Sequence, residues 1–179
     1  MRAMKQFLVL SAVGRDRPGI VNEVSKLILE HGGNMEDSRM AVLGGDFALI
    51  VLVSGPSDAV GNLQRNFPDF ARQRGLTGSA HETSGPQARV DRGFVPFDVR
   101  AVGLDHEGIV HRIAQALLDL GANVISMDTE SVSAPVTGAP MFSLNMRVAV
   151  PPTLSLAQLR STLQAAGDAI NVDITVQAA

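Results

Sequence analysis

Apolar residues in the first half of the chain form short runs and helically spaced stripes. Together they predict six elements in the order strand, helix, strand, strand, helix, strand. The strands are predicted at residues 6–13, 34–43, 46–54 and 77–83. The inward positions of the two helices are Ile20, Val21, Val24, Leu27 and Ile28 in the first, and Val60, Leu63 and Phe67 in the second.

Residues with special backbone preferences mark the ends of these elements. Asp16 is predicted to be the N-cap of the first helix, with Pro18 in its first turn. The glycines at 32–33 are expected to end that helix, and those at 44–45 to form the turn of a hairpin. Pro68 should break or kink the second helix, because proline lacks the N–H that an interior helical position donates.

The second half repeats the same order of elements. They are predicted at residues 95–102, 108–120, 123–133, 141–150, 155–166 and 171–177, with inward helical positions Ile109, Ile113, Leu117, Leu120, Leu156, Leu159 and Leu163. This order predicts an α+β protein with two ferredoxin-like βαββαβ domains, each an antiparallel sheet with its helices on one face. We expect domains at residues 1–84 and 95–179, joined by a polar linker at residues 85–94.

An internal repeat supports the two copies. Residues 12–34 and 101–123 align without a gap at an offset of 89 residues and share ten identities in 23 positions. The alignment includes GRDRPGIV at residues 14–21 and GLDHEGIV at residues 103–110. Because the offset is constant over this length, it indicates a duplication.

The strands of the two copies differ in polarity. Residues 47–53, FALIVLV, contain no polar position, whereas residues 142–148 alternate between apolar and polar side chains. A strand that is apolar on both sides is usually buried on both sides. We therefore predict that the open face of the first sheet is covered by the other domain or by another subunit.

Composition and charge narrow the class of protein. The formal net charge is −3 and the lysines and arginines form no basic stripe, so direct binding to nucleic acid is not expected. Cysteine is absent, which excludes disulfides and thiolate ligands. The apolar run near the N-terminus is interpreted as a strand rather than a leader, because residues 97–102 take the same place in the second copy. No run approaches the roughly 20 residues that span a membrane, and we expect a cytoplasmic protein.

Signatures of catalysis are sparse. His31, His81, His106 and His111 form no zinc-binding pair on one helical face, and the motifs of nucleophile elbows, phosphate loops and dinucleotide sites are missing. The adjacent carboxylates at residues 36–37 are interpreted as solvent charges, since neighbours on a strand point to opposite faces. The sequence therefore predicts no catalytic residue, no metal and no cofactor.

The repeated loop is a candidate binding site for a small anion. Backbone N–H groups at the helix start after Gly19 can hold a carboxylate, and Asn34 and Asn123 open the next strand in each copy with amides that both donate and accept. These groups suit a small amino acid. The same residue types also occur in an ordinary helix cap, so the residues alone leave both interpretations open.

The motifs resemble those of the ACT-domain family of small-molecule regulatory modules, present twice and covering nearly the whole chain. DRPGIV and NMEDSRM, at residues 16–21 and 34–40, are similar to strings of the glycine cleavage system transcriptional repressor group. The resemblance implies amino-acid binding at the loop between first strand and first helix, near the start of the second strand, at an interface between ACT units. The matching residues are Asp16, Arg17, Pro18, Gly19, Ile20 and Asn34 in the first copy, and Asp105, Gly108, Ile109 and Asn123 in the second.

The second copy departs from the pattern. His106 and Glu107 replace Arg17 and Pro18, and residues 125–127 read ISM where the first copy has EDS. The second site therefore has another ligand or none, and the first loop is the better candidate.

The resemblance implies a non-catalytic regulatory protein that senses a small amino acid such as glycine or serine and acts through a regulatory protein partner. A homodimer is expected. One alternative is a constitutive interaction module whose loops are only structural. Another is a relative of the regulatory module of formyltetrahydrofolate deformylase, which is disfavoured because the chain ends after the second copy with no hydrolase domain.

Overall fold

The computed structural model describes residues 5–85, 93–134 and 138–179. The chain divides into two compact units, Met1–Arg89 and Val90–Ala179, and each is described by itself. Most of the predicted linker at residues 85–94 lies outside the described residues, as do residues 135–137 between two of the predicted strands.

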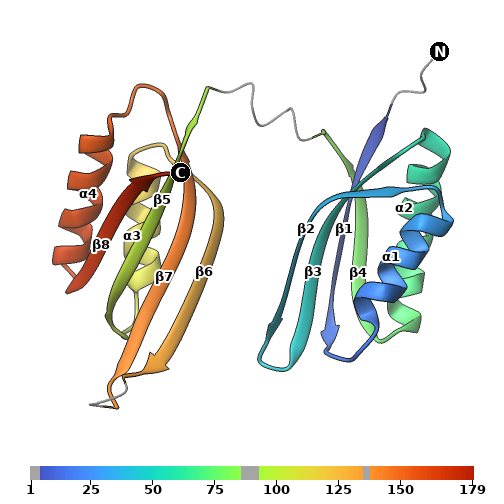
Figure 1. Cartoon of the computed structure of the whole chain (residues 1–179), viewed down its shortest axis with the longest axis horizontal. Coiled ribbons are helices and arrows are strands. Elements are labelled where there is room, and N and C mark those ends of the chain that lie inside the picture. Colours follow the sequence, from blue (N-terminus) through green and yellow to red (C-terminus); the bar gives the residue numbers. More distant parts are fainter. Residues whose placement is uncertain (1–4, 86–92, 135–137) are drawn as a thin grey trace. The chain divides into compact units, whose positions relative to one another are not determined.

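The first unit is a four-stranded antiparallel sheet with two helices on one face (Figure 1). Its strand order is β2-β3-β1-β4. The elements are β1 (Gln6–Arg15), α1 (Ile20–Glu30), β2 (Asn34–Leu43), β3 (Asp46–Gly55), α2 (Ser57–Gln73) and β4 (Leu76–Thr83).

The second unit repeats this topology with the order β6-β7-β5-β8. Its elements are β5 (Val95–Leu104), α3 (Ile109–Asp119), β6 (Asn123–Ser133), β7 (Pro140–Val150), α4 (Leu156–Asp168) and β8 (Val172–Ala178). Both units have the βαββαβ order with antiparallel sheets, so the prediction of two ferredoxin-like α+β domains is confirmed.

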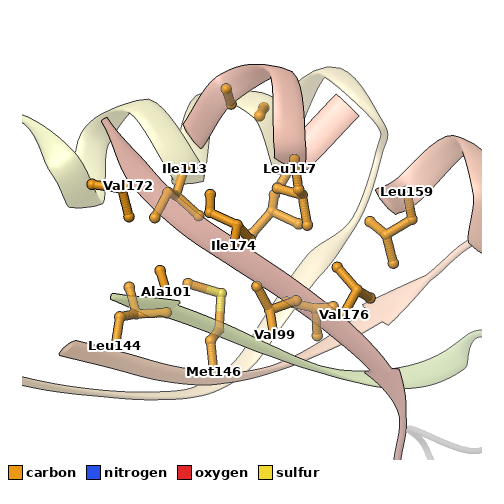
Figure 2. Close-up of a cluster of buried hydrophobic side chains, with 14 of the residues drawn as sticks. Val99, Ala101, Ile113, Leu117, Leu144, Met146, Leu159, Val172, Ile174 and Val176 are labelled. Carbon is orange, nitrogen blue, oxygen red and sulfur yellow. The ribbon is translucent and has the colours of Figure 1, made fainter. Parts of the chain in front are cut away.

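Each unit has its own apolar core between sheet and helices. In the second unit, Ile113 and Leu117 of α3 pack over Val99 and Met146 of the sheet (Figure 2). The corresponding layer of the first unit is formed by Leu8, Leu10, Val51, Val53, Leu63 and Phe67, all of which are fully buried. The predicted helical stripes therefore face the core. Val21 is an exception, because its side chain is 45% exposed.

The structure tests the hairpin predicted at residues 44–45 and the effect predicted for Pro68. The hairpin at Gly44 and Gly45 is confirmed, since both residues have positive φ, 59° and 92°, as a two-residue turn of this kind requires. Of the break or kink predicted at Pro68, the break does not occur: α2 continues through Pro68 to Gln73. Phe67 and Ala71, on either side of the proline, are both buried in the core, and this packing holds the last turn in place.

The open faces of the two sheets differ in chemistry. At the centre of the first, Val9 pairs with Leu52 and Ser11 with Ile50, and Ile50 is 49% exposed. At the centre of the second, Asp98 lies opposite Arg147 and the two form an ion pair of 2.8 Å between Oδ1 and Nε. The open face of the first sheet is therefore the apolar one. That another part of the protein or a second copy covers it stays a prediction.

Candidate functional site

A backbone hydrogen bond holds the loop between β1 and α1, and a glycine of this loop caps the helix. The Asp16 N–H donates to the Gly45 carbonyl over 3.1 Å, which fixes the loop to the β2–β3 hairpin. The N-cap of α1 is Gly19, with φ 96° and no side-chain cap, and the helix begins at Ile20. The predictions of Asp16 as N-cap and of Pro18 in the first turn are therefore wrong, because the glycine turn starts the helix further along.

This helix start leaves backbone donors for a ligand. The Gly19 carbonyl accepts the first intrahelical bond, from the Glu23 N–H at 2.9 Å. The N–H groups of Ile20, Val21 and Asn22 lie in the first turn, where an α-helix supplies no acceptor. Such groups, together with the helix dipole, stabilise a carboxylate.

An ion-pair cluster lies beside the same turn. Arg17 donates from both terminal nitrogens to the two carboxylate oxygens of Glu23, each over 2.8 Å. Arg74 approaches Glu23 Oε2 at 3.0 Å, and its guanidinium lies 3.6 Å from the centre of the Phe70 ring. The hydrogen bonds from Arg17 lower the pKa of Glu23 and raise the pKa of Arg17 itself. A cationic side chain is thus fixed at the loop.

A groove of about 610 Å³ opens at this loop. It combines the loop, the first turns of α1 and the end of the hairpin, and it is lined by Asp16, Arg17, Gly19, Ile20, Val21, Asn22, Ser25, Val42 and Phe47. The loop residues are recognisable in the sequence, whereas Val42 and Phe47 reach the groove only because β2 and β3 fold back beside the loop.

Asn34 lies at the opposite end of the sheet from this loop. It pairs with Ser54, which in turn pairs with Phe7 near the start of β1, whereas the loop follows Arg15 at the end of β1 (Figure 1). Eight residues of extended strand separate these ends by about 26 Å. The prediction that Asn34 faces the loop is wrong within one unit, because α1 returns the chain to the far end of the sheet before β2 begins.

A polar cluster surrounds Asn34 instead. Glu36 Oε1 accepts from Lys5 Nζ at 2.5 Å, from the Ser54 hydroxyl at 2.5 Å and from the Asn34 amide at 3.1 Å. Glu36 sits where the β2–β3 register shifts, so it is the residue of a β-bulge. Its interpretation as a solvent charge is therefore wrong. The signal in the sequence was the replacement of Glu36 by Ile125 in the second copy.

The bonds to Glu36 predict a dependence of stability on pH. Lys5, then Ser54 and Asn34, lower the pKa of Glu36 from 4.5 to about 2. A carboxylate with a lowered pKa stabilises the fold above pH 4.5, and that contribution is lost as the pH falls through 2. The difference in free energy of unfolding between wild type and Glu36→Gln should be constant above about pH 5.5 and shrink between pH 4.5 and 2. Denaturant titrations at several pH values measure it, and an equal difference at pH 7 and pH 2.5 would contradict the assignment.

The second loop has the same backbone but different side-chain contacts. Gly108 caps α3 with φ 89°, Ile109 begins the helix, and the Asp105 N–H donates to the Pro140 carbonyl over 2.9 Å. His106, in the place of Arg17, lies within 3.0 Å of the Glu107 carbonyl and 2.9 Å of the Ile170 carbonyl. These backbone bonds, with Asp105 nearby, raise the pKa of His106.

Two other features separate the second loop from the first. Asp105 Oδ2 accepts a hydrogen bond from the Ser131 hydroxyl at 2.5 Å, so this oxygen is already bonded to a residue of β6. Asn123 pairs with Ala149 at the far end of its sheet, as Asn34 does with Ser54. The repeat thus preserves the backbone of the loop while its polar contacts differ.

Within residues 5–85, 93–134 and 138–179, no group of three or more His, Asp or Glu side chains is placed to hold a metal ion. In the same part of the chain, no helix is long and apolar enough to cross a membrane.

The fold and the loop belong to a known class of regulatory module. The model of the ACT domain matches residues 6–81, nearly the whole first unit. An unknown protein from Galdieria sulphuraria has a solved structure with a TM-score of 0.79 and 32% identity, over 98% of this chain and 99% of that one. With the second unit repeating the topology of the first, the chain belongs to the ACT-domain family and has a tandem ACT fold.

Within the family, the chain is similar over part of its length to two proteins, one of which is a transcriptional repressor. It is 42% identical over 64 residues to the glycine cleavage system transcriptional repressor of Escherichia coli (strain K12), a match that covers 36% of this chain and 34% of the repressor. It is 36% identical over 70 residues to UPF0237 protein MK1213 of Methanopyrus kandleri, covering 38% of this chain and 78% of that protein.

A second solved structure extends the likeness to both units. It is assigned provisionally to the glycine cleavage system transcriptional repressors and has a TM-score of 0.71 with 26% identity, over 98% of each chain. The chain is thus related to that repressor, although the curated match spans only about a third of the repressor's length.

Proposed function

We propose that the protein is a non-catalytic amino-acid sensor that regulates through a protein partner, in the manner of a glycine cleavage system transcriptional repressor. Its ligand is a small amino acid such as glycine or serine, and it works in the cytoplasm as a homodimer. The similarity of about a third of the chain to that repressor supports the regulatory role.

The observation that carries the proposal is the first loop. Donors of the α1 first turn lie over a groove of about 610 Å³, and the Arg17 guanidinium is held beside them by Glu23. Both groups favour a carboxylate. Asp16, also on the groove, is an acceptor for an ammonium group or a hydroxyl. We assign Asp16, Arg17, Gly19 and Ile20 to ligand binding, with Pro18 shaping the turn.

If Asn34 contributes to the ligand site, its distance from this loop calls for a second subunit. The carboxylate and ammonium of one amino acid are a few ångströms apart, whereas Asn34 and the loop of one unit are about 26 Å apart. We propose that Asn34 contributes to the loop of another copy. In a two-fold dimer the relation is reciprocal, so two such sites form. The loop at Asp105, Gly108 and Ile109, with Asn123, has another ligand or none.

Titration calorimetry with glycine and L-serine tests the proposal. Gly19→Ala should weaken binding by about 10- to 100-fold, because a side chain at φ 96° strains the turn and moves its N–H groups away from the charged ligand. Gly108→Ala is the matched control: its φ is 89° and an added Cβ meets nothing within 4 Å. Both variants should lose about 1–2 kcal/mol of stability, but only the first should lose binding.

If neither glycine nor L-serine gives a heat of binding with wild type, the sensor proposal is wrong and the constitutive interaction module is the better interpretation. Thermal unfolding provides the same distinction independently. A ligand that binds only the folded state at 100 times its Kd adds about 2.7 kcal/mol to the free energy of unfolding. A purely structural loop would leave the unfolding temperature unchanged with either amino acid.

A further inference from the structure

The polar cluster around Glu36 has the chemistry of an ammonium site. Three donors converge on Oε1, while among the described residues no hydrogen bond reaches Oε2. Ser54 is fully buried, and the side chain of Glu36 is 25% exposed. The carboxylate is thus fixed through Oε1, and its side chain remains partly exposed. One of its three partners, Lys5, is itself an ammonium group, with 55% of its side chain exposed.

The second unit shows that the fold does not need this cluster. β6 has the same bulge, with the register shift between Val124 and Ser126, and the bulged residue there is Ile125. Ala149 takes the place of Ser54, because it pairs with Asn123 as Ser54 pairs with Asn34. Phe94 takes the place of Lys5 at the offset of 89 residues.

Three polar members of the cluster are therefore apolar in the second copy, while the backbone around them is the same. The bulge itself therefore forms without a polar cluster. The cluster occurs in the copy whose loop lines the groove, and the proposed function places both in one binding site.

We infer that Glu36 is the residue that recognises the ammonium group of the amino acid, and that Lys5 occupies this position in the free protein. This inference rests on the proposed function and extends it. The loop of one copy binds the carboxylate, and Glu36 with Asn34 of the other copy binds the ammonium. Lys5 then competes with the ligand, because its charge is attracted to the same carboxylate and repels a second cation.

The two residues have opposite expected effects on affinity. Glu36→Gln removes the charge and should weaken glycine binding by about 10- to 100-fold, the loss typical of a charge-assisted hydrogen bond. Lys5→Gln removes the competitor and should strengthen binding by about two- to fivefold, as expected of an exposed ion pair. Calorimetry with glycine and L-serine on the full-length chain measures both.

Matched controls separate these effects from a general change in charge. Asp37→Asn removes the neighbouring carboxylate, which pairs with Arg39 over 2.6 Å, and Lys26→Gln removes an ammonium that lies 3.7 Å from Glu30. Both variants should bind as wild type does. Circular dichroism is expected to show that Glu36→Gln is folded, since the second copy folds with isoleucine at the bulge.

The outcomes distinguish the two levels of the proposal. If wild type binds neither glycine nor serine, the proposed function fails and the inference fails with it. If wild type binds but Glu36→Gln binds equally well, the sensor stands and Glu36 is not its ammonium acceptor. If Lys5→Gln weakens binding, Lys5 assists the ligand and the competition is overturned.

Discussion

Phe67→Ala is expected to destabilise the first unit by about 3–5 kcal/mol and to leave the second unit folded. Phe67 is fully buried and stacks on Phe70 with 6.2 Å between ring centroids. The packing around it leaves no room for collapse: a Cβ added at Gly78 would lie 3.1 Å from Phe67 Cε1 and 2.6 Å from the Ala71 Cβ. The cavity should therefore persist, which places the cost at the upper end of the range.

The measurement is scanning calorimetry. In a unit of this size each kcal/mol corresponds to about 4–8 °C, so the unfolding transition of the first unit should fall by more than about 12 °C and separate from that of the second. Leu163→Ala is the counterpart, because Leu163 is fully buried in the core of the second unit. It should lower the other transition. One transition that moves as a whole in both variants would contradict two independently folding units.

Binding gives the prediction a functional readout. Glycine should protect only the transition that Phe67→Ala lowers, because the groove at Gly19 belongs to the first unit. Protection of the second transition would instead assign the ligand to the loop at Gly108.

The fold was predictable from the sequence because local and long-range signals agree. The stripe of Val60, Leu63 and Phe67 predicts a helix by its spacing, and those residues are buried in the core. The glycines at 44–45 fix the hairpin. The repeat at an offset of 89 residues predicts the same order of strands and helices in the second half. Helix starts were less predictable: Asp16 is a preferred cap residue, but its N–H is taken by the Gly45 carbonyl, and Gly19 provides the turn.

The candidate site was predictable only in part. Its loop has a motif, whereas the position of Asn34 depends on topology, since an antiparallel sheet sends the start of β2 to the far end of β1. The cluster at Glu36 joins residues 5, 34, 36 and 54, which are not adjacent in the sequence. Only the register and the bulge bring them together, and neither has a sequence signature of its own.

Ile50→Asp is expected to convert the protein to a monomer. Ile50 lies at the centre of the apolar open face, opposite Ser11, and is 49% exposed. The open face of the second sheet is charged around Asp98 and Arg147, so it is a poor match for this surface. A second copy of the same apolar face is the better match, and sheets that pack in this way lie about 10 Å apart.

An unpaired carboxylate at that centre costs several kcal/mol to bury, which weakens the dimer by at least about 100-fold. Light scattering over a range of concentrations measures the change. Asn145→Asp is the control, because Asn145 occupies the equivalent position of the second sheet, opposite Arg100, and should leave the mass unchanged. If the wild-type protein is monomeric at all concentrations, the prediction that a second copy covers the open face of the first sheet is wrong.

The same substitution tests whether the binding site is shared between subunits. Asn34 pairs with Ser54 on the open face that carries Ile50, so a dimer that covers Ile50 also covers the surface around Asn34. If the strands of the two copies run in opposite directions, the Asn34 end of one sheet meets the loop end of the other. Ile50→Asp should then reduce glycine affinity together with the dimer, although Ile50 contributes no group to the ligand. A monomer that retains full affinity would confine the site to the loop at Gly19.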